Sequence, residues 1–586
     1  MNIAERKQSA APGEAADWLA KFGAALQSQD ATAVAALFAA GGLWRDVLAF
    51  TWTIETHSGH AAIEAMLRAG LARTKPRDFR IPPQRTPPRW VSRAGTQCVE
   101  AIFEFDTAFG PGNGVVRLVA DPQKPGTLRA WTINTNLHEL RGFEEAFKKP
   151  AAESGPRDFG AANWQDRLAR QRAYEDREPA VIVVGGGQAG LSIAARLHQL
   201  GVDTLIVDRH ERAGDNWRTR YHSLTLHNEM HVNHLPYLPF PPTFPTFIPK
   251  DKLANWFEQY VESLELNFWT GTALAAGSYD AAKKQWNVTL RKSDGSERVM
   301  HPRHLIFATG VSSIPVTPDV PGINDFAGTK VHSGAFENAE QWHGRKALVL
   351  GSGTSGHDVA QELHAHGAHV TMIQRSKTYV VSLKEAQSVY AIYSEGIPFD
   401  DCDLLATSFP YPVLQRAYQL STTKGKMVDR KLIKALEERG FRIWYGEDET
   451  GFQMMYLRRG GGYYFNVGCS DLIISGEVDL MQYSDFEKFV AQGARMKDGS
   501  IVAADLLVLA TGYRNQQDTA RAYLGDKVAD SVGPVWGYGD GAELRNMWVR
   551  TAQPGLWFTA GSLAQCRIFS RYLALQIKAL EEGLIS

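Results

Sequence analysis

Two glycine-rich segments contain the residues best suited to chemistry in this chain, because their spacing fits the pyrophosphate group of a dinucleotide. The first segment, Gly185-Gly186-Gly187-Gln188-Ala189-Gly190, follows the apolar run Ala180–Val184 and precedes a helical pattern. In this spacing Gly185 permits a tight turn, Gly187 lets the backbone approach the pyrophosphate, and Gly190 lets the helix pack closely on the strand. The helix N-terminus then offers free N–H groups and a positive dipole end to the phosphates.

A carboxylate at the end of the next apolar run supports this interpretation. Asp208 lies 18 residues beyond Gly190, at the end of the strand-like segment DTLIVD. A carboxylate in this place accepts hydrogen bonds from both ribose hydroxyls and repels a 2′-phosphate. The glycine motif alone is a weak signal, but a strand before it, a helix after it and an acid at this distance make it specific.

The second glycine-rich segment has a different residue at the ribose position. Gly351-Ser352-Gly353-Thr354-Ser355-Gly356 follows the apolar run Lys346–Leu350, and the next strand-like run ends in Gln374-Arg375-Ser376. A guanidinium binds a 2′-phosphate through two hydrogen bonds, and a hydroxyl adds another. The segment is therefore predicted to bind NADPH rather than NADH, with Arg375 and Ser376 at the 2′-phosphate.

Two such units in one chain indicate a flavoprotein in which the first unit holds FAD and the second brings NADPH to it. The segments FATG (Phe307–Gly310) and LATGY (Leu509–Tyr513, which includes Gly512) each follow an apolar strand and mark where the chain crosses between the units. Disulfide reductases share this plan but need a redox pair of cysteines. No C-x-x-C pair exists among Cys98, Cys402, Cys469 and Cys566, which argues against that class and against a metal site.

The composition is that of an ordinary globular enzyme. The 586 residues suffice for roughly three or four domains of about 100–200 residues each. The net charge of -1, from 63 basic and 64 acidic residues, offers no basic surface for nucleic acid. Cysteine is scarce, and neither a signal peptide nor a run of about 18 apolar residues occurs. We therefore predict a cytoplasmic protein without a membrane span.

The order of the patterns divides the chain into an α+β part followed by α/β units. Helical periodicity covers residues 15–40 and Ala61–Ala72, and strand patterns follow from about residue 80 to Leu137. From Ala180 onward strands lead directly into helices, which predicts parallel sheets. The fold class is thus α/β, with two Rossmann-like dinucleotide-binding domains preceded by an α+β domain. The predicted units are the α+β domain (1–147), a linker (148–178), the first part of the FAD-binding domain (179–340), the NADPH-binding domain (341–505) with a helical insertion at about 385–480, and the C-terminal part of the FAD-binding domain (506–586).

A fingerprint lies between the two glycine-rich segments. Phe326, Gly328, His332 and Phe336 form the pattern F-x-G-x-x-x-H-x-x-x-F. This pattern resembles the signature of the flavin-containing monooxygenases, a family of class B flavoprotein monooxygenases. Baeyer–Villiger relatives usually have tryptophan and proline at its end, whereas this chain has Phe336-Glu337, which favours the heteroatom-oxygenating branch. We interpret His332 as a linker residue that couples domains rather than a reacting group.

The stretch that follows the first ribose position is also similar to this family. Asp208 to Arg218 matches the family's acid-x-x-x-x-x-G-G-x-W-R stretch, with Asp215 in place of the second glycine. The FAD contacts that this similarity implies are Arg209, Asn216, Trp217 and Arg218.

Residues 224–253 resemble the corresponding region of the YUCCA branch of the family, whose members oxidatively decarboxylate a 2-oxo acid. In the animal-type branch an asparagine near the flavin occupies about this place. The resemblance therefore makes His227 and Asn228 the candidate catalytic residues, and His227 also a candidate FAD contact.

The function implied by the resemblance is insertion of one oxygen atom from O₂ into a small organic substrate. In the family NADPH reduces FAD, and O₂ then forms a flavin C4a-(hydro)peroxide that transfers the oxygen. Two alternatives stay open: oxidative decarboxylation of a 2-oxo acid, and a non-oxygenating NADPH:flavin oxidoreductase or oxidase. The partners predicted are the substrate and O₂, with a homodimer left open.

The α+β domain resembles SnoaL-like cones, through its helical opening and its long strands. A pocket in such a cone would offer Asp46, His57 and His60 for substrate binding or a second acid–base activity. The alternative, which we favour, is a scaffold or dimerisation module whose pocket is filled by core side chains. The aromatic and methionine-rich insertion is either a packed helical addition or the wall of a substrate channel.

Overall fold

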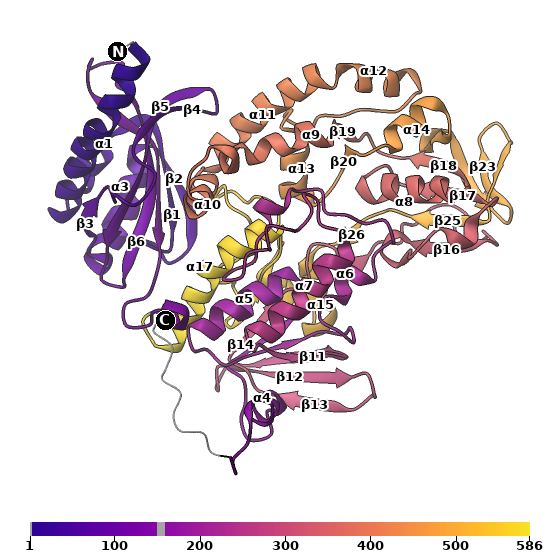
Figure 1. The fold of residues 1–586 in the computed structure, drawn as a ribbon, viewed down its shortest axis with the longest axis horizontal. Coiled ribbons are helices and arrows are strands. Elements are labelled where there is room, and N and C mark those ends of the chain that lie inside the picture. The colour runs from indigo at the N-terminus through magenta and orange to yellow at the C-terminus, as the bar shows by residue number, and fades with distance from the viewer. Residues whose placement is uncertain (1–2, 149–158) are drawn as a thin grey trace.

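The N-terminal part of the chain forms one sheet with helices on the face that points away from the rest of the molecule (Figure 1). The computed structural model describes residues 3–148 and 159–586. Neighbouring strands of this sheet are antiparallel, except that β1 and β7 are parallel. In spatial order the strands are β2 (Ile54–Ser58), β1 (Phe38–Val47), β7 (Leu128–Leu137), β6 (Pro111–Ala120), β5 (Thr96–Asp106) and β3 (Arg77–Arg80), with β4 (Arg89–Arg93) also paired to β5. The helices are α1 (Ile3–Gln27), α2 (Ala31–Ala35) and α3 (Gly59–Thr74).

The helical pattern predicted for residues 15–40 extends beyond the observed end of the helices. Helix α2 stops at Ala35, and Phe38 already belongs to strand β1. Phe38 fits a helical period with the residues before it, but tertiary pairing with β7 decides its conformation. The pairing register shifts between Phe38 and Leu43, where the chain carries Gly41 and Gly42.

Aromatic side chains fill the interior between this sheet and its helices. Trp18 stacks on Phe22 with ring centroids 4.9 Å apart, and Phe79 stacks on Phe105 at 5.1 Å. The buried aromatic residues of this interior are Trp18, Phe22, Phe38, Trp44, Phe50, Phe103 and Phe105. The interior is therefore packed with side chains, which favours the scaffold interpretation of this domain.

The three candidate acid–base residues of this domain have local structural partners. The buried carboxylate of Asp46 accepts hydrogen bonds from the backbone of Phe50 and from the backbone and hydroxyl of Thr51 at 2.8–2.9 Å, and from the hydroxyl of Thr135 at 2.7 Å. His60 lies 3.2 Å from the carbonyl of Phe38, and His57 lies 3.3 Å from Glu55. Each of the three side chains thus has its own local contact, and these contacts do not bring the three together in one pocket.

A five-stranded parallel sheet carries the first glycine-rich segment. Every residue of β8, β9, β14 and β27 is buried, as expected for a parallel sheet covered on both faces. The strands, in spatial order, are β10 (Asn267–Trp269), β9 (Thr204–Val207), β8 (Val181–Val184), β14 (His304–Phe307) and β27 (Leu556–Phe558). The helices packed around it include α5 (Gln188–Gln199), α6 (Asp215–Arg218), α7 (Lys250–Ser263) and α17 (Leu563–Glu581).

A second five-stranded parallel sheet carries the second glycine-rich segment. Its strands, in spatial order, are β16 (Thr329–His332), β25 (Leu506–Leu509), β17 (Lys346–Leu350), β18 (His369–Gln374) and β21 (Val478–Gln482). Helices α8 (Thr354–Ala365) and α14 (Cys469–Ser475) pack on it. Together the two sheets confirm the predicted α/β fold class with two Rossmann-like units.

The sheet pairing moves two of the predicted domain boundaries. Strand β16 pairs with β25, and β25 pairs with β17, so both strands belong to the second sheet, although the boundaries at 340/341 and 505/506 assigned them to the FAD-binding unit. Both strands have only four residues. Their sheet is decided by the partner they pair with, which local sequence does not specify. Of the predicted linker, residues 149–158 lie outside the described residues, and α4 (Trp164–Ala173) follows them.

Smaller elements extend the two units. The three-stranded sheets are β11 (Thr272–Asp280), β12 (Gln285–Lys292) and β13 (Glu297–Met300), and β22 (Phe486–Val490), β23 (Gly493–Met496) and β24 (Ile501–Ala503). Helices α15 (Gln516–Leu524) and α16 (Asp526–Val532) follow the second unit. Strand β15 (Ile314–Pro315) pairs with β26 (Tyr513–Arg514), so the two segments in which the chain crosses between the sheets are hydrogen-bonded to each other.

The insertion in the second unit is mainly helical. It begins after β19 (Tyr379–Ser382), whose parallel partner is β20 (Tyr463–Asn466). Its helices are α9 (Leu383–Ala386), α10 (Phe399–Thr407), α11 (Tyr411–Val428), α12 (Arg430–Glu438) and α13 (Gly451–Arg459). Helix α10 lies beside the N-terminal sheet and contacts β6 (Figure 1). Among the described residues, no helix combines the length and apolar character that crossing a bilayer requires.

A buried carboxylate organises the contact between the N-terminal sheet and this insertion. Glu100 accepts hydrogen bonds from Arg93 at 2.7 Å and from Arg117 at 2.9 Å, and Arg93 also donates to Glu395 of the insertion. Burial raises the pKa of Glu100, but the charges of Arg117 and Arg93 outweigh it and hold that pKa at about 2. The ion pair therefore stabilises the contact wherever Glu100 is ionised.

Replacing Glu100 by glutamine is expected to lower the free energy of unfolding by about 3–5 kcal/mol, because buried Arg117 loses its counterion. Since folding depresses the pKa of Glu100, its contribution is present above the usual pKa near 4.5 and is lost as the pH falls toward about 2. Urea unfolding across this pH range should show the loss in the wild type and a flatter profile in Glu100→Gln.

Glu487→Gln is the matched control, because Glu487 and Arg495 form an ion pair at the protein surface. This variant should change the free energy of unfolding by less than about 1 kcal/mol. Equal effects of the two substitutions would contradict the structural role given to Glu100.

Candidate active site

The first glycine-rich loop has the geometry that a pyrophosphate requires. A Cβ atom at Gly190 would lie 1.9 Å from the carbonyl oxygen of Gly185, so helix α5 packs on the loop only with glycine there. At Gly187, the residue before α5 begins, an added Cβ would meet only the side chain of Asn216, at 2.9 Å. Gly190 thus serves packing, whereas Gly187 keeps the approach to the helix N-terminus open.

Asp208 is held beside this loop. Its carboxylate accepts hydrogen bonds from the backbone N–H of Gly186 at 2.6 Å and of His210 at 2.9 Å, and it contacts the His210 ring at 2.7 Å. Burial raises the pKa of Asp208, but the hydrogen bonds from His210 and the backbone outweigh it and leave that pKa below its usual value. The ionised carboxylate is therefore in place to accept ribose hydroxyls, with exposed Arg209 next to it.

Buried polar atoms near this loop have no partner within the described protein. They are the amide oxygen of Asn216, the indole nitrogen of Trp217 and the hydroxyl of Thr309. Burying such atoms unpaired costs free energy, so a bound ligand that pairs with them is favoured. These residues fit the polar edges of FAD.

Arg218, a predicted FAD contact, is largely bonded to the protein. Its guanidinium donates to Ala213 and Asp215 at 2.8 Å, to Glu258 at 2.9 Å and to Asn255 at 3.0 Å. Four of its five N–H groups thus hold α6 against α7. Its contact with FAD stays a prediction.

The second loop repeats the geometry of the first. A Cβ at Gly356 would lie 2.1 Å from the carbonyl oxygen of Gly351, whereas at Gly353 the nearest atom would be 3.9 Å away. Two of the three hydroxyls of the loop are engaged with the protein: Ser352 shares a 2.7 Å hydrogen bond with Thr378, and Thr354 donates to the carbonyl of Tyr463 at 3.0 Å. The backbone N–H groups at the start of α8 and the hydroxyl of Ser355, which lines the cavity, are therefore the groups that suit phosphates.

The predicted readers of the 2′-phosphate lie at the end of β18. Arg375 and Ser376 are exposed and line the same cavity as Ser355 and the rest of the loop. Lys377 is also exposed there and was not predicted, although it directly follows Ser376 in the sequence. Two cations and a hydroxyl at this edge suit a 2′-phosphate better than a free ribose hydroxyl.

Both loops and the insertion open into one cavity of about 990 Å³. Gln188 lines it from the first loop, and Gly351 to Gly356 line it from the second. Much of the remaining wall is aromatic, with the side chains Tyr390, Tyr393, Phe409, Tyr411, Tyr418, Trp444, Phe452, Tyr456, Tyr463, Phe465, Tyr538, Trp548 and Phe569. The insertion therefore contributes to the cavity wall, and its role as the wall of a substrate channel stays a prediction.

His227 and Asn228 both line this cavity. The His227 ring meets Phe465 edge-on with centroids 5.5 Å apart, and Gln387 donates to the His227 carbonyl at 2.9 Å. Asn228 shares a hydrogen bond with the hydroxyl of Tyr390, and burial raises the pKa of that tyrosine, which keeps it neutral.

Sequence reasoning missed the partner of His227. Asp358, on helix α8 of the second unit, has a carboxylate oxygen 3.9 Å from His227 Nε2 and accepts a hydrogen bond from the hydroxyl of Tyr221. Burial raises the pKa of Asp358, which the charge of His227 partly opposes. No local signal marks this pair, because it forms only when the two units dock.

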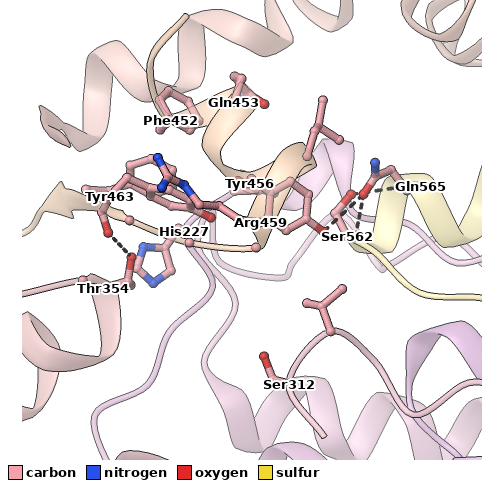
Figure 2. A pocket seen from close by; sticks show the side chains of 18 of the residues that line it. His227, Ser312, Thr354, Phe452, Gln453, Tyr456, Arg459, Tyr463, Ser562 and Gln565 are labelled. Carbon is pink, nitrogen blue, oxygen red and sulfur yellow. Dashed lines mark hydrogen bonds between the residues drawn. The ribbon is translucent and has the colours of Figure 1, made fainter. Parts of the chain in front are cut away.

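The N-terminus of the last helix also reaches the cavity. Ser562 caps α17 with Gln565 in a capping box, and Tyr456 donates to the Gln565 side chain at 3.3 Å. Figure 2 shows Ser562 and Gln565 on one side of the cavity, with His227, Thr354 and Tyr463 on the other. The positive end of the α17 dipole favours negative charge at this place.

His332 connects the end of β16 to the second crossover segment, and its interpretation as a residue that couples the domains stays a prediction. Its Nε2 lies 3.1 Å from the carbonyl oxygen of Gly512, its Nδ1 accepts a hydrogen bond from the N–H of Gly334 at 3.1 Å, and the ring meets Tyr513 edge-on. Gly512 itself lines the cavity. His332 therefore joins β16 to the second crossover and does not reach into the cavity.

Comparisons with known proteins agree with this geometry. The sequence pattern of the pyridine nucleotide-disulphide oxidoreductase family matches residues 182–393, a span without any cysteine. Indole-3-pyruvate monooxygenase YUCCA1 of Oryza sativa subsp. japonica is 31% identical over 355 residues, covering 60% of this chain and 80% of that protein.

Solved structures share the fold. Cyclohexanone monooxygenase from Rhodococcus sp. Phi1 bound to NADP⁺ superimposes with a TM-score of 0.50 at 15% identity, covering 69% of this chain and 84% of that one. The OTEMO complex with FAD and NADP has a TM-score of 0.50 at 15% identity, covering 70% and 86% of the two chains.

The fold and the site define a flavoprotein with two dinucleotide-binding units that face one cavity. By its similarity to the rice protein, the chain belongs to the flavin-containing monooxygenase family of enzymes, which confirms the family predicted from the fingerprint.

The two glycines of the second loop give separable predictions. Gly356→Ala should lower the free energy of unfolding by about 1–3 kcal/mol, because its Cβ would overlap the Gly351 carbonyl.

Gly353→Ala should leave the free energy of unfolding within about 0.5 kcal/mol of the wild-type value. It should weaken NADPH binding about tenfold or more, because the methyl group occupies the approach to the helix N-terminus. Calorimetry and NADPH titration measure both; equal destabilisation by the two substitutions would disprove this division of roles.

Arg375→Ala should raise the KM for NADPH about ten- to a hundredfold, since it removes charge-assisted hydrogen bonds to the 2′-phosphate. The KM for NADH should stay nearly constant. Lys377→Ala should act in the same direction with a smaller effect, and exposed Arg495→Ala should change neither constant. Steady-state kinetics with both nucleotides measures these KM values. A similar rise of the KM for NADH and for NADPH would contradict the assignment of Arg375 to the 2′-phosphate.

Proposed function

We propose that this enzyme uses FAD, NADPH and O₂ to insert one oxygen atom into a small apolar substrate, while the second oxygen atom leaves as water. The observation that carries the proposal is the single cavity into which both nucleotide loops open, with a wall that is otherwise largely aromatic. The aromatic part of the wall suits an aromatic or aliphatic substrate, and a substrate bound there displaces water from the reaction.

The protein groups around the first loop support FAD as the resident cofactor. Asp208 is ionised beside the loop, and the buried polar atoms of Asn216, Trp217 and Thr309 lack protein partners. Arg375 and Lys377 support NADPH as the reductant at the second loop. When bound, FAD accepts a hydride from NADPH and activates O₂, which no side chain of the cavity does by itself.

The side chains contribute positioning, water exclusion and proton control. Asn228, tied to the neutral hydroxyl of Tyr390, offers a fixed amide to the reacting oxygen. His227 Nε2, with Asp358 at 3.9 Å, is the group that holds or returns a proton. The N-terminus of α17, fixed by Ser562 and Gln565, favours negative charge on the reduced flavin ring.

A second candidate function is oxidative decarboxylation of an aromatic 2-oxo acid. The rice relative is named for indole-3-pyruvate, and the cavity wall offers Arg459 and Arg220 in addition to the cations at the second loop. A carboxylate substrate needs such a cation, and an aromatic side chain needs the aromatic wall. Release of CO₂ from phenylpyruvate, with NADPH and O₂ consumed in equal amounts, would favour this reaction over oxygenation of a neutral substrate.

The test of the proposed function is the stoichiometry of NADPH, O₂ and hydrogen peroxide across a substrate panel. A true substrate should lower the peroxide formed per NADPH and carry one ¹⁸O atom from ¹⁸O₂ in its product. Asn228→Ala should raise the share of peroxide with the same substrate. One peroxide per NADPH with every compound, and no ¹⁸O in any product, would instead identify a non-oxygenating oxidase.

A further inference from the structure

One end of the cavity is closed by the N-terminal sheet, whose Arg45 and Ile54 are among the lining residues. We propose that this sheet is the end wall of the substrate cavity, and that the Arg45–Glu543 pair in it binds an uncharged polar group, such as a hydroxyl, of an otherwise apolar substrate. The proposal rests on the proposed function, because it assumes that the cavity receives the substrate.

Strand alternation explains why Arg45 points outward. On β1 its neighbours Trp44 and Asp46 face the packed interior, so Arg45 faces the opposite side of the sheet. Thr56 of β2 is directly opposite Arg45 in the antiparallel register, and Ile54 is two residues earlier on the same face. The three side chains therefore form one outward patch of the N-terminal sheet.

This patch meets a loop of the flavoprotein units through a bidentate ion pair. Arg45 donates from Nε to Glu543 at 2.7 Å and from one terminal nitrogen at 2.8 Å, and its other terminal nitrogen donates to the Thr407 carbonyl at 2.8 Å. Thr56 adds a hydroxyl donor to Glu543 at 2.9 Å. Burial lowers the pKa of Arg45, but the Glu543 carboxylate outweighs it and leaves that pKa raised, so the guanidinium stays charged within its ion pair with Glu543.

The pair keeps some capacity for a ligand. The side chain of Glu543 is 17% exposed, against 7% for Arg45, and both residues line the cavity. Each terminal nitrogen of an arginine carries two N–H groups and each carboxylate oxygen has two lone pairs, so the recorded bonds do not use up the donors and acceptors. One hydroxyl can bind here as donor and acceptor at once.

The surroundings select against a net charge. The wall next to the pair is apolar or aromatic, with Ile54, Phe409, Tyr538 and Phe569 among its residues. An ion brought to this place would lose its hydration and find a pair whose charge is already cancelled. A neutral hydroxyl or amide loses less on desolvation, and this difference defines the class of ligand.

The end wall is anchored outside the cavity as well. Asp401 on α10 is buried and accepts hydrogen bonds from Arg85 and from the backbone of Thr86 at 2.7 Å. Ile102 and Val115 of the sheet pack against Leu404 and Leu405 on the same helix. Helix α10 also supplies Thr407, so the N-terminal sheet holds the helix that completes the end wall.

The test measures binding of three probes with one ring system to the FAD-loaded full chain, saturated with NADP⁺, by equilibrium dialysis. The probes are naphthalene, 2-naphthol and 2-naphthoate. The wild type should bind 2-naphthol most tightly and 2-naphthoate most weakly. Glu543→Gln uncovers the charge of Arg45, so the affinity for 2-naphthoate should rise about tenfold relative to 2-naphthol, the scale of one charge-assisted hydrogen bond. Arg45→Met should abolish the preference for 2-naphthol over naphthalene.

Glu395→Gln is the matched control. It removes a carboxylate from Arg89 and Arg93 at the same interface, but none of these three residues lines the cavity. The ratios among the probes should stay at the wild-type values in this variant. Unchanged ratios in Glu543→Gln, or equal changes in Glu543→Gln and Glu395→Gln, would overturn the proposal.

Two further variants leave the Arg45–Glu543 ion pair in place and therefore test the proposal even if loss of that ion pair prevents folding. Thr56→Val removes only one hydrogen bond to Glu543 and should lower the preference for 2-naphthol severalfold. Ile54→Phe narrows the end wall and should weaken all three probes alike. If neither variant changes any probe affinity, the N-terminal sheet is not part of the binding site. Because binding needs no turnover, this failure differs from failure of the proposed function, which appears only in the stoichiometry of NADPH, peroxide and product.

Discussion

The pairing of the two crossover segments is the constraint on which the site depends. Strand β15 pairs with β26, and the Val316 N–H donates to the Gly512 carbonyl at 3.0 Å. These bonds join the chain where it leaves the first sheet to the chain where it leaves the second. Together with contacts such as Tyr221 to Asp358 and Ser223 to Glu362, this junction brings the N-termini of α5 and α8 to one cavity. Pairs such as His227 with Asp358 depend on it, because their members come from different units.

The charges of the cavity are divided between two regions with different tasks. Exposed Arg375 and Lys377 directly follow β18, a strand at the opposite side of the molecule from the N-terminal sheet (Figure 1), and they suit a multiply charged nucleotide. At the N-terminal sheet Arg45 is cancelled by Glu543. The cations at the second loop suit phosphates, whereas phosphates buried at the apolar end would stay unpaired.

The nucleotide loops can be predicted from the sequence because the residues that form each loop lie close together in the chain. Gly185 to Gly190 and Asp208 lie within one βαβ unit, so spacing along the chain equals position in space. The boundaries near residues 340 and 505 cannot be predicted in this way, because β16 and β25 are four-residue strands whose sheet depends on a distant partner. For the same reason the sequence around Phe38 predicts a continued helical pattern, whereas pairing with β7 makes Phe38 the first residue of a strand.

The sequence by itself determined two dinucleotide units, the acidic residue that ends the second strand of one and the arginine that follows it in the other, and the family fingerprint, since these features rest on backbone conformation and on residues close together in the chain. The tertiary structure decided what surrounds them. It placed Asp358 beside His227, gave the insertion to the cavity wall and set Arg45 of the N-terminal sheet against Glu543, almost 500 residues later in the chain. Such contacts arise from the docking of units, and docking is governed by whole complementary surfaces that no short motif encodes.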